Sequence, residues 1–422
     1  MAFGETLSYI FIPIIAWGAY EIIRGNYKKW YILSIGLGLL VLSHLITSVF
    51  TILTLFVFVI FNYKCLFKEK ERIYAFVKAG IVVVLLSVYE ILPLLEQLSY
   101  MDFFLKYQNE INPPGQHKLG LLETLQAFFV GLKVEDKNTT YYMWDQGCGF
   151  ILTILIALRL FVKEKNEKIR MADYSLLIGF VFVLFTTKLA PWGRFPLNLL
   201  KDIQFPWRLF EYVTFFFAVA GATYVVSLAT TKKRKVLAGS VIFIATITII
   251  SINAYNFRNS HFLKGATPVA KMSNNFNLGS FEYVPAKYVY YTFSFWERID
   301  RRKDEVICQH EETEISNYVH EKSNIRFHID TKSQVDSIMV PLFLYKGYEA
   351  TFNGKEVPIA ESKMGLVELS INGKGEVNVD FEGTFIQKYS FYVTLFTFIL
   401  LTVYIYYVSR SRSHRTISDS DL

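Results

Sequence analysis

The stretch IQFPWRLFE, residues 203–211, places costly polar residues at the start of a long apolar segment. Arg208 carries a planar, permanently charged fork of N–H donors that suits a phosphate group. Trp207 and Glu211 are four residues apart and share a helical face, whereas Arg208 and Glu211 are three apart and can pair. Pro206 fits the first turn of a helix, where its missing N–H costs nothing. The stretch therefore predicts a helix start that attracts an anion.

Other polar residues lie close to the ends of apolar segments. An ionisable group inside the hydrocarbon costs about 2.5–3.5 kcal/mol at the helix centre, so it normally faces a cavity or a partner. We therefore expect a polar cavity that opens to one side of a membrane. Its candidate residues are Glu5, His44, Glu90, Glu96, Asp102, Asp145, Arg194, Lys201, Asp202, Gln204, Arg208 and Glu211.

Structural roles compete with these functional interpretations. Trp207 and Arg208 are also typical anchors at a membrane interface. His44 could equally be a buried histidine bonded to a neighbouring span, and Asp145 a solvated loop carboxylate. For Arg194, in PWGRFP, a structural role and a functional role are equally expected.

The composition predicts an integral membrane protein. Of 422 residues, 52% are hydrophobic, 17% aromatic and only 19% charged, which is typical of neither a soluble domain nor a disordered chain. A helix needs roughly 17–25 apolar residues to cross about 30 Å of hydrocarbon. The apolar run from Trp30 to Tyr63 would reach about 50 Å as one helix, so we expect it to fold back at Ser43-His44. The predicted spans are 5–23, 30–43, 45–62, 73–94, 147–162, 173–189, 209–229, 236–253 and 388–408.

Basic clusters predict the orientation of these spans. They follow the first, third, fifth, seventh and last spans, and so fall on one side of the membrane, as the positive-inside rule requires. The formal charge of +7 is thus a topology signal, and nucleic acid is not an expected partner. This topology places residue 1 outside without a cleavable signal peptide. We therefore expect either a chain that lacks an N-terminal part or a short N-terminus that inserts unaided.

The predicted fold class is mostly α: a polytopic transmembrane helical bundle with an extracytoplasmic β-sandwich before the last span. The bundle covers 1–254 with outer loops 96–146 and 190–208, the β-rich domain 255–387, the final span 388–408 and a cytoplasmic tail 409–422. Within the first loop, LGLLETLQAFFVGL predicts a helix along the interface. In the β-rich domain, SNIRFHID and GEVNVDF alternate as strands do, and Asn353-Gly354 and Asn372-Gly373 predict hairpin turns.

Familiar motifs of soluble enzymes are missing from the sequence, including a phosphate-binding glycine loop, GxSxG, HExxH and paired CxxC. The seven histidines are scattered, so neither a metal nor another cofactor is predicted. Cys148 and Cys308 could pair if both lie outside, but free, partly buried thiols are the favoured interpretation of the three cysteines.

Three stretches resemble one family of bacterial membrane proteins: LSH at 42–44, IQFPWRLFE at 203–211 and GSFEYVP at 279–285. The chain resembles the proteins labelled 6-pyruvoyl-tetrahydropterin synthase related, which are similar to the YfhO-like proteins of the GT-C glycosyltransferase group. The resemblance implies a multi-pass protein of the bacterial cell membrane. It also implies transfer of a sugar from a lipid-linked polyprenyl-phosphate donor to a cell-envelope polymer or lipid at the outer face.

In that group an acidic residue in the first outer loop usually serves as general base. The segment 2–18 resembles an internal span of the family, so we expect that loop to be missing, and a partner chain could supply it. Carried over by resemblance, Arg208, Trp207 and Gln204 would hold the phosphate or frame the cavity. His44 would line the cavity, and Glu282 would link the outer domain to the membrane. Asp145 and Asp102 are the alternatives within this chain for the catalytic carboxylate. Together with Arg194 and Glu211 from the polar span ends, the substrate-binding candidates are Arg208, Trp207, Gln204, Arg194, His44 and Glu211.

Two other classes of function stay open. A non-catalytic envelope protein could bind or position a lipid-linked glycan with the same residues. A transporter is less favoured, because the spans show no evident inverted repeat and no Gly/Pro-broken segments at matching positions.

Overall fold

The computed structural model describes residues 3–107, 118–129, 147–195, 197–198, 206–259, 283–291, 304–332 and 335–418. The chain forms two compact units. The first consists of Met1–Tyr107 and Asn275–Leu422, and the second of Gln108–Asn274.

Among the described residues, six helices are long and apolar enough to cross a membrane: Gly4–Ile23, Lys70–Tyr100, Glu167–Thr186, Pro206–Leu228, Lys232–Ile252 and Phe385–Arg410. Each coincides with one of the nine predicted spans. The predicted spans 45–62 and 147–162 correspond to the shorter apolar helices Leu45–Phe61 and Gly149–Phe161, and span 30–43 to a helix of 13 residues. The structure thus confirms the apolar helical character of the chain, and the number of spans stays a prediction.

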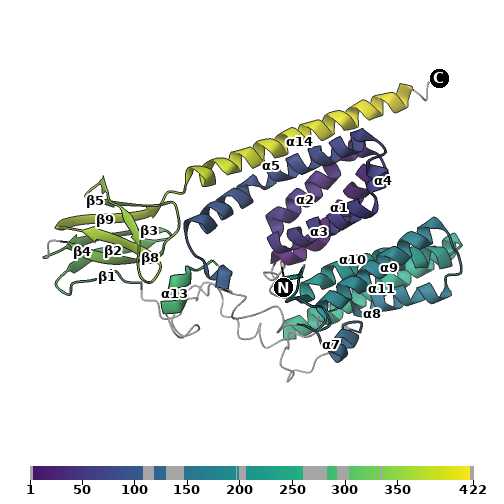
Figure 1. Ribbon diagram of the computed structural model, residues 1–422, viewed down its shortest axis with the longest axis horizontal. Coiled ribbons are helices and arrows are strands. Elements are labelled where there is room, and N and C mark those ends of the chain that lie inside the picture. The colour runs from purple at the N-terminus through teal and green to yellow at the C-terminus, as the bar shows by residue number, and fades with distance from the viewer. Residues whose placement is uncertain are drawn as a thin grey trace. The chain divides into compact units, whose positions relative to one another are not determined.

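The first unit begins with a group of helices that fold back on one another (Figure 1). His44 has an extended backbone, with φ −157° and ψ 103°, which ends one helix and starts the next. At the other end of the group, Nε of Arg24 donates to Oδ1 of Asn62 at 3.0 Å. This contact joins the ends of the first and third helices, so the predicted reversal at Ser43-His44 is confirmed. The helices are α1 (Phe3–Ile23), η1 (Tyr27–Lys29), α2 (Tyr31–Ser43), α3 (Leu45–Phe61), α4 (Tyr63–Leu66) and α5 (Lys70–Tyr100).

The second unit is helical in its described residues. Its core is a cluster of buried apolar side chains, with Val213 and Phe217 fully buried at its centre. The predicted interfacial helix in 119–132 is shorter than expected, because the described helix has six residues and ends before Ala127. The elements are α7 (Leu121–Gln126), α8 (Gly149–Ala157), η4 (Leu158–Phe161), α9 (Glu167–Thr186), η6 (Pro206–Leu209), α10 (Phe210–Leu228) and α11 (Lys232–Asn259).

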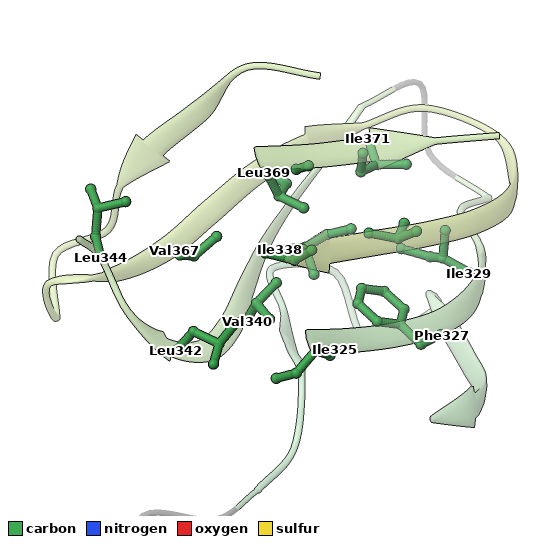
Figure 2. Close-up of a cluster of buried hydrophobic side chains, with 13 residues drawn as sticks. Ile325, Phe327, Ile329, Ile338, Val340, Leu342, Leu344, Val367, Leu369 and Ile371 are labelled. Carbon is green, nitrogen blue, oxygen red and sulfur yellow. The ribbon is translucent and has the colours of Figure 1, made fainter. Parts of the chain in front are cut away.

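The β-rich part of the first unit consists of two antiparallel sheets, with strand orders β1-β4-β8-β7 and β2-β3-β9-β5-β6. Side chains from both sheets meet in one buried cluster, which includes Phe327, Ile338 and Leu369 (Figure 2). Along β3, alternate residues face this cluster because side chains alternate across a strand. The strands are β1 (Ile307–Cys308), β2 (Glu314–Glu321), β3 (Asn324–Asp330), β4 (Asp336–Phe343), β5 (Tyr348–Phe352), β6 (Lys355–Glu356), β7 (Ile359–Glu361), β8 (Leu366–Ile371) and β9 (Lys374–Phe381).

Only one of the two predicted hairpin turns is a hairpin. Asn353 and Gly354 have φ of 51° and 75° and join the paired strands β5 and β6, as predicted. The prediction for Asn372-Gly373 was wrong, because β8 and β9 belong to different sheets. Gly373 has a φ of 94°, and its N–H donates to Oγ1 of Thr331 at 2.7 Å. The same pair of residue types stands in both places, but at Asn372-Gly373 the chain passes from one sheet to the other.

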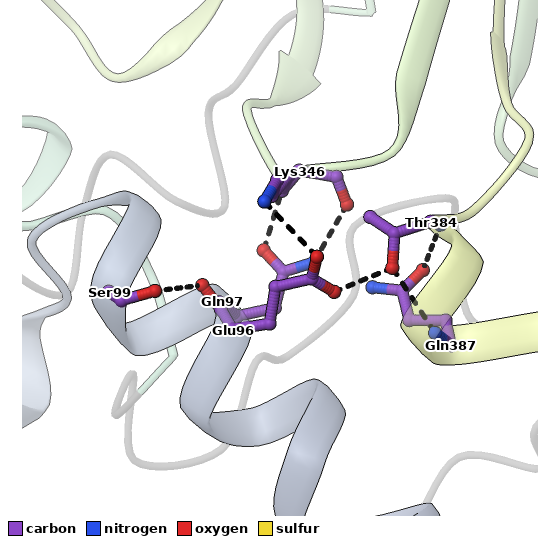
Figure 3. Close-up of polar contacts among 6 residues, drawn as sticks. All are labelled: Glu96, Gln97, Ser99, Lys346, Thr384 and Gln387. Atoms are coloured by element: carbon purple, nitrogen blue, oxygen red, sulfur yellow. Dashed lines mark hydrogen bonds and ion pairs between the residues drawn. The ribbon is translucent and has the colours of Figure 1, made fainter. Parts of the chain in front are cut away.

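Polar contacts tie the β-rich part to the membrane-length helices of the first unit (Figure 3). The buried carboxylate of Glu96, near the end of α5, lies 3.1 Å from Nζ of Lys346 and accepts from the hydroxyl of Thr384 at 2.5 Å. Gln97 exchanges two hydrogen bonds with the backbone of Lys346, at 2.8 and 3.0 Å. Thr384 immediately precedes α14 (Phe385–Ser418), which packs along α5. Glu96, Gln97, Lys346 and Thr384 are called the clasp below.

Glu96→Ala is expected to lower the free energy of unfolding by about 1.5–3 kcal/mol. The substitution removes a charged acceptor from the partly buried hydroxyl of Thr384 and from the half-exposed ammonium of Lys346. Unfolding of the purified full chain in detergent would measure the loss. The matched control is Glu382→Ala, because Glu382 and its partner Lys388 are both half exposed and 3.7 Å apart. An exposed ion pair contributes about 0–1 kcal/mol, so equal losses in the two variants would contradict a stabilising clasp.

Candidate functional site

The start of α10 brings together three of the predicted substrate-binding residues. Pro206 is buried and occupies the first turn of η6, which leads directly into α10. Trp207 is half buried, and the guanidinium carbon of Arg208 lies 5.9 Å from the centre of its ring. Glu211, in the first turn of α10, is only 2% exposed. The predicted helix start at Pro206 is therefore confirmed, and the anion site at Arg208 stays a prediction.

The side chain of Arg208 lies in partly apolar surroundings. Its Nε is buried, and its neighbour Trp207 packs on the apolar cluster that contains Phe210 and Val213. A cation over an indole face is worth about 0.5–2 kcal/mol, most when water is excluded. Because apolar walls lower the local dielectric, a phosphate that reached this guanidinium would be held more strongly than in water.

Arg194 is exposed in the loop after α9. Its backbone N–H donates to the carbonyl of Pro191 at 2.9 Å, so the described contact concerns the turn and not the side chain. The neighbouring Trp192, which sequence reasoning passed over, is buried, and its Nε1 donates to the carbonyl of Phe185 at 3.0 Å. Trp192 anchors PWGRFP to the end of α9, and Arg194 as a substrate ligand stays a prediction.

His44 belongs to the first unit and caps a helix. Its Nδ1 accepts from the backbone N–H of Thr47 at 3.3 Å and lies 2.7 Å from Oγ1 of the same residue. An acceptor at this position satisfies a donor that the first turn of α3 would otherwise leave unmet. The capping contact accounts for the histidine in LSH without a ligand, and the cavity role stays a prediction.

Asp102 also belongs to the first unit, directly after α5. Its carboxylate accepts from Nζ of Lys106 at 2.5 Å and from the hydroxyl of Tyr107 at 2.8 Å. The hydrogen bond from Lys106 and then that from Tyr107 lower the pKa of Asp102 below its ordinary value. The carbonyl of Asp102 accepts from the N–H of Ala286 at 2.8 Å, next to the EYVP stretch. A carboxylate held in this way is a weak base, so the contacts favour a structural role.

Asp145, Gln204 and Glu282 lie outside the described residues. The predicted catalytic role of Asp145, the predicted phosphate contact of Gln204 and the predicted link through Glu282 stay predictions.

One polar cluster in the second unit, formed by Arg159, Asp173 and Tyr224, was not predicted from the sequence. Arg159 in η4 donates from Nε and Nη2 to the two carboxylate oxygens of Asp173 in α9, at 2.5 and 2.9 Å. The hydroxyl of Tyr224 in α10 donates to the same carboxylate at 2.8 Å, and this tyrosine is fully buried. Charged residues within apolar segments were the available signal, since such groups need a partner in a membrane. The cluster joins three helical elements of this unit.

A groove of the second unit lies away from these candidates. It has a volume of about 610 Å³ and runs between α8, α10 and α11. Its walls are apolar except at Lys235 and Thr246, and Arg208, Trp207 and Glu211 do not line it. Over the described part of the chain, no group of three or more His, Cys, Asp or Glu side chains could hold a metal ion. The three cysteines are free thiols. Comparison with protein-family models, curated proteins and solved structures finds no match to this chain.

Proposed function

We propose that this chain is a multi-pass protein of the bacterial cell membrane that transfers a sugar from a polyprenyl-phosphate donor to a cell-envelope glycan or lipid at the outer face. The proposal includes a crossing of the membrane by all nine apolar segments and an outer β-sandwich built from the two sheets. It is supported by six helices of membrane length and by the resemblance of IQFPWRLFE to GT-C proteins. The observation that carries it is the half-buried Arg208, whose guanidinium carbon lies 5.9 Å from the centre of the Trp207 ring in η6, just before α10.

In this proposal Arg208 acts on the leaving group. Negative charge grows on the phosphate as the sugar departs, and a fixed guanidinium stabilises that charge most in the transition state. The N–H groups at the start of η6 and α10 add a positive field in the same place. A carboxylate would take the proton of the acceptor hydroxyl. Asp145 is the better candidate within this chain because Asp102 is engaged by Lys106 and Tyr107, and a partner chain could supply the base instead.

The state of Asp102 favours a second candidate function. Its lowered pKa and its two donors make it a poor proton acceptor. A chain with a weak base and an anion-binding helix start would bind or position a lipid-linked glycan without transferring the sugar. Both functions use Arg208, and they differ in whether any turnover exists.

Arg208→Ala is expected to weaken binding of a polyprenyl monophosphate by about 10- to 150-fold. This range corresponds to the loss of a charged hydrogen bond worth about 1.5–3 kcal/mol. Binding would be measured with the purified full chain in detergent or nanodiscs. The matched control is Arg170→Ala, because Arg170 is exposed near the start of α9 and its partner Glu167 is exposed and 3.9 Å away. Its binding should stay within about twofold of the parent chain.

Asp145→Asn separates the two functions. A transferase should lose turnover of polyprenyl-phosphate sugar in this variant while it keeps the affinity for the donor. A binding protein should show no turnover even in the parent chain. Absence of polyprenyl-phosphate binding by the parent chain, or equal binding by the Arg208 and Arg170 variants, would refute both.

A further inference from the structure

The apolar groove of the second unit has the shape and surroundings of a lipid site. It lies between α8, α10 and α11. Small residues on its walls, including Gly149, Ala218 and Ala222, leave room for a ligand such as an acyl chain. Its volume of about 610 Å³ falls in the range of about 300–1,000 Å³ that is usual for ligand pockets. The groove therefore suits a long apolar ligand.

The groove also separates α11 from its neighbours. None of the residues in the apolar window of α11 is buried, and its contacts within the unit are a few with α8 and α10. Along α11 the lining runs from Lys235 to Ile249, which is about 21 Å of helix. Half of a bilayer core is about 15 Å thick, so an acyl chain that starts at Lys235 would reach the bilayer centre inside the groove.

Charge distinguishes one end of the groove. Lys235 lines it, and Lys232, Lys233 and Arg234 precede Lys235 in the first turn of α11. All four side chains are exposed. In the topology predicted from the basic clusters, this end faces the cytoplasm. A cluster of cations beside a groove between membrane helices, on the cytoplasmic side, is suited to an anionic lipid head group.

We propose that this groove binds an anionic phospholipid of the inner leaflet, with one acyl chain between α8, α10 and α11 and the phosphate beside Lys235. The apolar walls account for the chain, and the cations at a single end account for the sign of the head group. The bound lipid would fill the space that keeps α11 apart from α8 and α10. The proposal does not depend on the chemistry at Arg208.

The test compares lipid retention by variants of the full chain. Gly239 lines the groove, and a Cβ added there meets no atom within 4 Å, so Gly239→Phe should place an aromatic ring in the groove. Gly80→Phe is the matched control, because a Cβ on Gly80 also meets nothing within 4 Å and Gly80 lies in α5 of the other unit. Lys235→Gln removes the charge that lines the groove and keeps Lys232, Lys233 and Arg234. Each chain would be purified and reconstituted with phosphatidylglycerol or phosphatidylcholine, and the retained lipid counted by native mass spectrometry.

The parent chain and Gly80→Phe should retain phosphatidylglycerol at least fivefold over phosphatidylcholine. Gly239→Phe should lose that retained lipid, and Lys235→Gln should lose the preference between the two lipids while it keeps its elution volume in gel filtration. Equal retention of both lipids by the parent chain would overturn the proposal. So would unchanged retention in Gly239→Phe, or a dimer in the parent chain that Gly239→Phe dissociates, since a second copy would then occupy the groove.

Discussion

Phe327→Ala is expected to lower the free energy of unfolding of the β-rich part by about 3–5 kcal/mol, the usual cost of truncating a buried aromatic side chain. Phe327 is fully buried and lies among side chains of both sheets (Figure 2). On β3 it stands opposite Val377 of β9, which is also fully buried. A cavity at this position would remove contacts from both sheets at once. We would measure it by unfolding of the purified full chain and by limited proteolysis.

The control for this prediction lies on the same strand. His328 follows Phe327, points to the other face of β3 and is exposed, so His328→Ala should change the free energy of unfolding by no more than about 0.5 kcal/mol. The strand and the truncation to alanine are the same, and only burial differs. Similar losses in both variants would show that the cluster does not stabilise this part of the chain.

Gly18→Ala is expected to lower the free energy of unfolding by about 3 kcal/mol, at the upper end of the usual cost of overpacking. A Cβ on Gly18 of α1 would lie 2.3 Å from the backbone N and 2.6 Å from the Cα of Leu33 in α2. Backbone atoms cannot turn aside as a flexible side chain does, so the two helices would have to separate. Small residues permit such close approach in membrane helices, where packing replaces the hydrophobic effect as the driving force.

Gly80→Ala gives the opposite expectation and serves as the control. Gly80 lies inside α5, and a Cβ there meets no atom within 4 Å. Alanine is favoured over glycine in a helix by about 0.8–1.0 kcal/mol in water, so this variant should be equally stable or slightly more stable. Thermal unfolding of both variants in the same detergent would show the difference in sign. A Gly18→Ala chain as stable as the parent would mean that α1 and α2 do not approach so closely.

Much of the local structure could be predicted because its causes are local. Apolar runs of sufficient length predict helices, since a membrane helix satisfies its backbone within one segment. The reversal at Ser43-His44 followed from a run too long for one crossing, and the extended backbone of His44 confirms it. The strand SNIRFHID is β3, because alternation of apolar and polar residues matches two faces with different surroundings. The helical start at Pro206, where η6 leads into α10, was also predicted from one residue, because proline fits the first turn of a helix.

Contacts between distant segments decided the rest. Asn353-Gly354 and Asn372-Gly373 are the same pair of residue types, yet only the first joins paired strands. β8 pairs with β4 and β7 in one sheet, whereas β9 pairs with β3 and β5 in the other. Arg159, Asp173 and Tyr224 come from three elements, and no local pattern says which charge meets which.

The sequence by itself determined the apolar helices, the alternating strands and the proline-led helix start with Arg208, since each depends on the order of neighbouring residues. Only the tertiary structure decided that Asp102 is held by donors beside the EYVP stretch, that Glu96 meets Lys346 and Thr384, and that a groove ends at Lys235. These features depend on distances between segments far apart in the chain. Such distances are set by how whole faces pack and not by any single stretch.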